Sequence, residues 1–309
     1  MDLIDKNVLI DLLINCRARY QDMAVKNNVT ANAIRKRVDR LISQGIIEEF
    51  IVELSLAMVD AELLLSLIYT DGSEDENAFI DQLSTPRGTN PYINYIGPAS
   101  GGEYTLYIIF STYTEGTKGL SETSAFFKSF NEVQKVDMHP LLYPRGKKLN
   151  LSPMDLKVLR YLVENPRMPI SEISNRSRVT SRNVRNIIVN FARNNNVNLT
   201  IRWNLNAGDS IQFLAQIQWD DRQTDFTTIK NWLFNQFPEE FWGELICATK
   251  PLLFGTFVVN NLSSVAKITQ SIKKNPTITS VVTLLGKPSR GFPDIRTTHL
   301  NKLIAEAGL

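Results

Sequence analysis

Cysteine and histidine are scarce in this chain of 309 residues, which contains two of each. Cys16 and Cys247 lie in different halves of the chain, and their spacing matches neither a disulfide framework nor a metal site. No Ser/His/Asp or Cys/His set stands out, and we expect His139, which precedes a proline in a predicted strand, to be structural. The sequence therefore predicts no catalytic residue, no metal and no cofactor, and it indicates that the protein is not an enzyme.

Long apolar runs are also missing. The longest, such as residues 63–69, fall far short of the roughly 20 residues that a membrane helix needs. The opening residues MDLIDKN lack a basic segment leading into an apolar one, so we expect no signal peptide. With so few cysteines, these features favour a protein of the reducing cytoplasm that has no membrane partner.

The net charge of +2 conceals an uneven distribution along the chain. Residues 56–142 hold twelve acidic and four basic residues, a net charge of −8. Residues 150–205 hold three acidic and nine basic residues, a net charge of +6. Four basic residues and one acidic residue also cluster within residues 30–45. Such clusters favour polyanion binding, and the acidic segment would avoid the same polyanion.

The chain contains an internal repeat, in which residues 1–51 align without a gap on residues 151–201. The two segments share ten identical positions, whereas about three are expected by chance. Half of the identical positions are apolar, and three of these, Val8/Val158, Leu9/Leu159 and Leu12/Leu162, have helical spacing. The sequence therefore predicts that one fold occurs twice in the chain.

Each copy is expected to be a winged helix-turn-helix. In the first copy we predict helices over residues 5–14, 20–26 and 30–44 from their apolar periodicity. Thr30 is a suitable N-cap for the third helix, and Gly45 is placed to stop it. The apolar and alternating residues that follow, from Ile46 through Phe50 and onward, predict the strands of a wing.

The outer face of the third helix carries the residue types that contact DNA in helix-turn-helix proteins. In the first copy the candidates for contact with double-stranded DNA are Thr30, Asn32, Arg35, Lys36 and, at a phosphate, Arg40. In the second copy they are Arg176, Arg178, Thr180, Arg182, Asn183, Arg185 and Asn186, with Arg176 and Arg178 at phosphates. The second copy replaces Arg37 by Ile187 and Gly45 by Asn195, so it either contacts DNA or serves as a structural, pairing module.

The segments after each copy predict the order β-α-β-β-α-β, which is typical of ferredoxin-like domains. The fold class is therefore α+β, with two helix-turn-helix modules alternating with two sheet domains. We predict these boundaries: helix-turn-helix modules at 1–55 and 151–205, sheet domains at 56–143 and 206–286, a basic linker at 144–150 and a tail with a helix at 287–309.

This arrangement resembles the Lrp/AsnC (feast/famine) transcription regulators. The resemblance rests on Thr30, Ile34, Arg37-Val38, Leu41 and Gly45-Ile46-Ile47, and on the hairpin residues Gly97 and Tyr104. It implies a regulator that contacts operator DNA, responds to an amino-acid-like effector and forms a homodimer through its sheets. Because the chain carries two sheet domains, they could instead pair internally. For the effector we expect contacts from the small residues of the hairpin, Gly97, Ser100, Gly101 and Gly102.

Two other functions compete with a regulator. Siroheme decarboxylases resemble the same architecture, but their polycarboxylate substrate needs a cationic pocket. The first sheet domain has only Arg87, Lys118, Lys128 and Lys135 as cations, which argues against this activity. The third hypothesis is an assembly module whose helix-turn-helix units bind protein.

Overall fold

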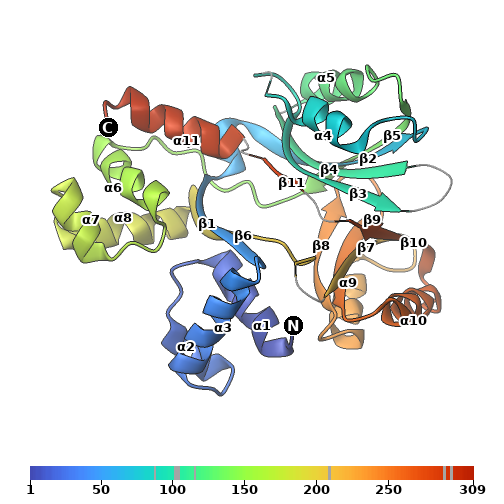
Figure 1. Cartoon of the computed structure of the whole chain (residues 1–309), viewed down its shortest axis with the longest axis horizontal. Coiled ribbons are helices and arrows are strands. Elements are labelled where there is room, and N and C mark those ends of the chain that lie inside the picture. The colour runs from blue at the N-terminus through green and yellow to red at the C-terminus, as the bar shows by residue number, and fades with distance from the viewer. Residues whose placement is uncertain (87, 101–104, 115, 208–209, 288–289, 293–294) are drawn as a thin grey trace. The chain divides into compact units, whose positions relative to one another are not determined.

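The computed structural model describes the chain except residues 87, 101–104, 115, 208–209, 288–289 and 293–294. The fold is α+β, as predicted, and it divides into two compact units (Figure 1). The first, here called the head unit, comprises residues 1–61, 144–204 and 295–309. The second, here called the sheet unit, comprises residues 62–143 and 205–294. Each unit takes segments from both halves of the chain.

The head unit contains both helix-turn-helix modules. The first module consists of α1 (Leu3–Ile14), α2 (Tyr20–Lys26), α3 (Ala31–Ser43) and β1 (Ile47–Leu54). Asp2 and Asp5 form a capping box at the start of α1, and the hydroxyl of Thr30 accepts a hydrogen bond from the Ala33 N–H at 3.1 Å. Gly45 follows α3 with a φ of +70°. Glycine adopts this left-handed conformation without strain.

The second module has the same order of elements. They are α6 (Pro153–Glu164), α7 (Ile170–Ser177), α8 (Ser181–Asn194) and β6 (Val197–Trp203). Ser152 caps α6, and the hydroxyl of Thr180 accepts a hydrogen bond from the Asn183 N–H at the start of α8. Asn195 takes the place of Gly45 with a φ of +48°. Asparagine tolerates this conformation better than most residues do.

The two modules are joined through their strands. β1 pairs with β6 in an antiparallel, two-stranded sheet, so the strands predicted for a wing come one from each module. Phe50 pairs with Ile201 and Ile51 with Thr200. The alignment of the two repeats converts one of these pairs into the other, which places a pseudo-two-fold axis between them.

The first helix of each module lies against the other module's strand, α1 against β6 and α6 against β1. The Cys16 N–H donates to the Leu199 carbonyl at 2.8 Å, and the Thr200 hydroxyl donates to the Leu13 carbonyl at 2.6 Å. Arg17 donates to the carbonyls of Pro166 and Met168 at 2.7 and 2.8 Å, so backbone groups of both modules are hydrogen-bonded across the junction. The modules therefore form one interlocked body.

A short 3-10 helix η1 (Leu56–Val59) and α11 (Ile295–Glu306) complete the head unit. The helix α11 packs on β1, η1 and α6. Arg296 in α11 donates to both carboxylate oxygens of Glu53 in β1, at 2.8 and 3.1 Å, and both side chains are largely buried. The predicted C-terminal helix is thus a structural part of the head unit.

The sheet unit contains both ferredoxin-like halves. The first half consists of β2 (Ala61–Thr70), α4 (Glu76–Ser84), β3 (Tyr92–Ser100), β4 (Thr105–Thr114), α5 (Thr117–Phe127) and β5 (Val133–Leu142). The second consists of β7 (Ile211–Trp219), α9 (Phe226–Gln236), β8 (Phe241–Cys247), β9 (Leu252–Val259), α10 (Leu262–Lys273) and β10 (Ile278–Gly286), followed by β11 (Arg290–Gly291). Both halves have the predicted element order.

The two halves share one nine-stranded sheet in the order β10-β7-β9-β8-β5-β2-β4-β3-β11. They meet at two seams. At one seam β5 pairs with β8, and at the other β10 pairs with β3, which closes the sheet on itself. The two sheet domains therefore pair internally within a single chain, one of the two arrangements that the sequence left open.

Three apolar clusters of described residues in the sheet unit follow from this arrangement. One, with Phe79 and Phe127, lies between the first half-sheet and its helices. Another, with Leu233 and Phe257, lies between the second half-sheet and its helices. The third, with Leu65, Leu214 and others, takes residues from the inner faces of both halves. Pairing thus buries the face that each half-sheet leaves without helices.

Candidate nucleic-acid interface

The outer face of α3 presents the predicted DNA-contact residues of the first module. Asn32, Arg35 and Lys36 are exposed there. Among the described residues neither Arg35 nor Lys36 has an ion-pair partner. The Thr30 hydroxyl is occupied as the N-cap, so this residue orients the helix start.

Arg40, in contrast, is held by the protein itself. Its guanidinium donates to both oxygens of Asp5 at 2.6 Å, and Arg37 binds Asp2 and the same Asp5 at 2.7 Å. Asp5 is buried, with 2% of its surface exposed. Burial alone would lower the pKa of Arg37, but its hydrogen bonds to Asp5 and Asp2 outweigh burial and raise the pKa. These arginines brace α3 against the start of α1.

The outer face of α8 presents more cationic groups. Arg182, Arg185 and Asn186 are exposed, and Asn183 is half-buried at the N-cap hydrogen bond. In the part of the chain that the structure describes, Arg182 and Arg185 have no ion-pair partner. The helix contains no acidic residue, whereas α3 carries Asp39.

The two predicted phosphate ligands before α8 differ from one another. Arg176 is ion-paired with Glu164 at 2.7 Å and Glu172 at 3.7 Å, and it lies over the Tyr161 ring. Arg178 is exposed in the turn between α7 and α8 with a φ of +56°. Within the described ranges it has no ion-pair partner, so Arg178 is the better placed of the two to meet a phosphate.

The junction between the modules also involves residues that the sequence did not single out. The Arg167 guanidinium lies 4.7 Å from the Tyr20 ring centre and 5.2 Å from the Phe50 ring centre. Burial raises the pKa of the Cys16 thiol to about 11, although Arg167 and Arg17 partly offset the effect. The Cys16 thiol is therefore neutral at pH 7, and it fills space at the junction.

Two of the predicted effector residues, Gly97 and Ser100, lie in β3. Gly97 is buried in this strand and pairs with Ile108, while the Ser100 backbone pairs with Leu285 and Thr105. The strand thus extends beyond the predicted hairpin start. Gly101 and Gly102, with Tyr104, lie outside the described residues.

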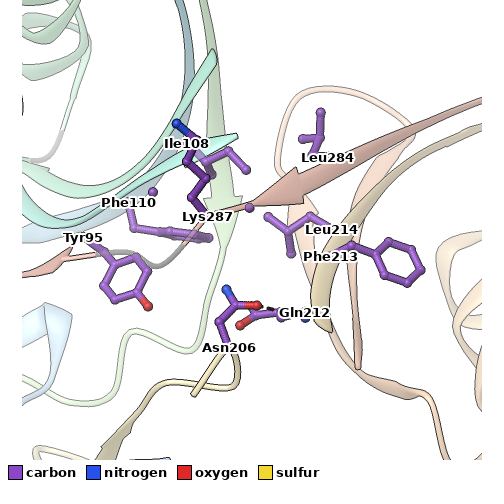
Figure 2. A pocket seen from close by; sticks show the side chains of 11 residues that line it. Tyr95, Ile108, Phe110, Asn206, Gln212, Phe213, Leu214, Leu284 and Lys287 are labelled. Carbon is purple, nitrogen blue, oxygen red and sulfur yellow. Dashed lines mark hydrogen bonds between the residues drawn. The ribbon is translucent and has the colours of Figure 1, made fainter. Parts of the chain in front are cut away.

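Gly97 lines a small hollow of about 50 Å³ inside the sheet unit (Figure 2). The other lining residues come from distant parts of the chain: Tyr95, Ile108, Phe110, Asn206, Gln212, Phe213, Leu214, Leu284, Gly286 and Lys287. Sequence patterns carried no signal for most of them, because the pairing of β3 with β10 brings them together. Of the cations named for the first sheet domain, Arg87 lies outside the described residues and the other three do not line this hollow.

The described residues include no group of three or more His, Cys, Asp or Glu side chains placed to hold a metal ion. No helix in that part of the chain is long and apolar enough to cross a membrane.

Residues 151–188 match a winged helix-turn-helix DNA-binding family. The match covers α6, α7 and the start of α8, so it concerns the second module. The sequence resemblance had been carried mainly by the first module. No curated protein sequence matches the chain.

The whole chain is similar in fold to two solved structures of the siroheme decarboxylase NirDL. The alignment with one of them covers 99% of this chain and 100% of the NirDL chain, with 9% identity and a TM-score of 0.55. The other, in complex with an iron-uroporphyrin III analogue, has the same coverage, 8% identity and a TM-score of 0.56. The alignment with a structure of E. coli AsnC covers 48% of this chain and 97% of the AsnC chain, with 18% identity and a TM-score of 0.33.

The prediction that the protein is not an enzyme is contradicted by these full-length likenesses, because an enzyme is built on the same fold. The prediction rested on the absence of a familiar catalytic set in the sequence. Residues that meet only through the tertiary structure leave no such pattern, so the absence was a poor guide.

Proposed function

We propose that the protein is a DNA-binding transcription regulator whose two modules contact one DNA duplex together. The main support is the head unit itself, in which two helix-turn-helix modules are locked around a pseudo-two-fold axis by β1 and β6. Helix-turn-helix dimers bind two half-sites with this symmetry. Here one chain supplies both modules, and the second matches a DNA-binding family.

The two recognition helices differ, so we propose an asymmetric operator. In α8, Arg182 and Arg185 are suited to guanine edges and Asn186 to an adenine edge. In α3, Arg35 and Asn32 would act similarly, with Lys36 at a phosphate. Because α3 also carries Asp39 and α8 has no carboxylate, the second module should bind its half-site more strongly.

The test compares paired charge removals in the full chain. Binding is measured on duplex DNA from upstream of the protein's own reading frame and on a duplex of random sequence, at several salt concentrations. Arg182→Ala with Arg185→Ala should weaken binding to the upstream duplex by about tenfold or more and reduce the salt slope. Arg35→Ala with Lys36→Ala should have a smaller effect of the same kind.

A matched control removes two exposed cations from the sheet unit, by Lys267→Ala with Lys273→Ala in α10. This variant has the same charge change and should bind as the parent does. If both module variants also bind as the parent does, the modules do not contact DNA, and the hypothesis of a protein-binding assembly module gains support.

A second candidate function rests on the full-length likeness to NirDL, namely the decarboxylation of a siroheme-like tetrapyrrole. Such a substrate carries several carboxylates and requires cations around it. The hollow between β3 and β10 has one lysine, Lys287, and it is ion-paired with Glu76 at 2.8 Å. Titration with iron-uroporphyrin III tests this candidate, since binding would shift the porphyrin absorbance and no shift would exclude it.

A further inference from the structure

The outer face of α8 carries an apolar side chain among its cationic and polar ones. Val189 has 47% of its surface exposed. Arg182, Arg185 and Asn186 precede it by seven, four and three residues, so all four side chains lie on one face of the helix. The buried side chains of α8 lie on the opposite face. The core of the second module therefore does not account for a valine at this position.

The first module has a different residue at the equivalent position. The alignment of the two repeats places Asp39 of α3 opposite Val189, and Asp39 is also exposed. Both modules have the same order of helices and the same N-cap. A valine is therefore not required by the helix-turn-helix fold, and the two modules differ in charge and polarity on the face that carries the candidates for DNA contact.

The chemistry of the major groove indicates what an exposed valine on this face would contact. A recognition helix in the groove brings its outer side chains against the base edges, and residues with this spacing can reach them together. Guanine, adenine and cytosine present hydrogen-bonding groups there, whereas thymine adds a 5-methyl group. A valine over a polar edge would remove its water without replacing the hydrogen bond. A valine over a methyl group removes apolar surface from water on both sides.

We propose that Val189 contacts the 5-methyl group of a thymine and thereby selects this base in the half-site of the second module, an inference that rests on the DNA binding proposed for that module. Val189 lies three residues beyond Asn186, a rise of about 4.5 Å along the helix. Successive bases of one strand are about 3.4 Å apart. The thymine should therefore lie about one base pair beyond the base that Asn186 contacts.

The first module should lack this preference. The carboxylate of Asp39 has no apolar surface to offer a methyl group, and it is suited to accept a hydrogen bond from the amino group of cytosine. The thymine should therefore be selected in one half-site only. This gives the asymmetric operator a defined position at which its two halves differ.

The first experiment selects bound duplexes from a pool of random sequence with the full chain. The parent should enrich thymine at one position of one half-site. Val189→Ser should lose this enrichment and keep that at the neighbouring positions, which Arg185 and Asn186 would contact. Valine and serine have similar helix propensities, so α8 should remain folded. Val163→Ser is the matched control, because it changes an exposed valine of α6 in the same module, and it should select as the parent does.

The second experiment removes the methyl group from the DNA and leaves the protein unchanged. Deoxyuridine pairs as thymidine does and lacks only the 5-methyl group. At the selected position it should weaken binding by the parent about threefold to fivefold, as expected for one methyl-sized contact. It should leave the affinity of Val189→Ser unchanged. The same replacement at a thymine outside both half-sites is the control and should have no effect on the parent.

The outcomes separate this inference from the proposed function. If the parent selects a sequence but tolerates deoxyuridine at every thymine of it, Val189 does not contact a methyl group and the inference is wrong, while DNA binding stands. Equal losses in the parent and in Val189→Ser have the same meaning. If the parent selects no sequence at all, sequence-specific regulation is wrong and the role of Val189 fails with it.

The replacement in the DNA also keeps the test independent of how well the variant folds. The parent alone, compared on the thymidine and deoxyuridine duplexes, either shows the loss of affinity or does not.

Discussion

At the scale of single residues, the buried carboxylate of Asp5 makes more interactions than its counterpart Asp155 in the second module. Both complete a capping box at the start of a helix. Asp5 additionally binds Arg37 and Arg40 of α3, whereas the position equivalent to Arg37 in the second module is the buried Ile187. Both modules have a buried apolar core, and the first adds an ion-pair cluster at a position where the second has the apolar Ile187.

This difference predicts unequal effects of one substitution at equivalent sites. Asp155→Ala removes a cap and should lower the free energy of unfolding by about 1 kcal/mol. Asp5→Ala removes a cap and leaves two arginines without their buried partner, so the loss should reach about 2–3 kcal/mol. Urea unfolding of the two variants measures the difference, and equal losses would show that the ion pairs contribute nothing.

His139 is a second residue whose surroundings determine its behaviour. It is 3% exposed in β5 beside Phe254, and within the described part of the chain its ring nitrogens have no hydrogen-bond partner. Burial lowers the pKa of His139 below its usual 6.5, and the charge of Lys250 lowers it further. The neutral form is therefore favoured in the folded protein.

The direction of the pKa shift predicts how stability depends on pH. The unfolded chain takes up the proton more readily than the folded one. The contribution of His139 to the free energy of unfolding is therefore fully present above about pH 6.5, and it decreases at lower pH by up to about 1.4 kcal/mol per pH unit. Urea unfolding of the parent and of His139→Leu, at about pH 7.5 and about pH 5.5, measures this contribution. A parent whose loss on acidification equals that of His139→Leu would contradict the prediction.

At the scale of the elements, α3 and α8 end in the same way with different residues. Gly45 and Asn195 both have positive φ angles, +70° and +48°. A Cβ added at Gly45 would meet nothing within 4 Å, so its only penalty is conformational. Gly45→Ala should cost about 1 kcal/mol, and Gly45→Asn should cost less. Thermal unfolding of both variants measures which one is less stable. If the penalty were purely steric, the larger asparagine would not be the milder substitution.

The helix α11 is held to β1 by the ion pair between Arg296 and Glu53. Because both side chains are largely buried, Arg296→Ala should destabilise the head unit by about 2–3 kcal/mol. The control Lys302→Ala breaks an exposed pair on the same helix, and it should change stability by only about 0.5 kcal/mol or less. Chemical unfolding followed by circular dichroism compares the two, and similar losses would mean that burial is unimportant.

Element boundaries show where sequence patterns were sufficient. The predicted range 20–26 matches α2, and Thr30 caps the next helix, because helical periodicity and capping are local properties. The pattern did not show that β3 continues to Ser100, since the residues Gly97–Ser100 are typical of turns. Their strand conformation depends on pairing with β4 and β10, which are distant in sequence.

At the scale of the whole molecule, one chain contains what two subunits usually supply in helix-turn-helix dimers. We therefore expect a DNA complex with one chain for each duplex that carries two half-sites. Size-exclusion chromatography with light scattering measures this stoichiometry. A complex with two chains on such a duplex would contradict it and would support the homodimer that the sequence resemblance implied.

The sequence by itself determined the α+β class and the order of the elements, because hydrophobic periodicity, caps and turn residues act over a few positions. It also indicated which helix faces are basic. Only the tertiary structure decided that β1 pairs with β6 and that the two half-sheets close at β3 and β10. It also decided that the Arg40 guanidinium forms an ion pair with Asp5. These features depend on contacts between segments that are far apart in the chain. The residue pattern of a strand indicates which face is buried, but it does not determine which other strand pairs with it.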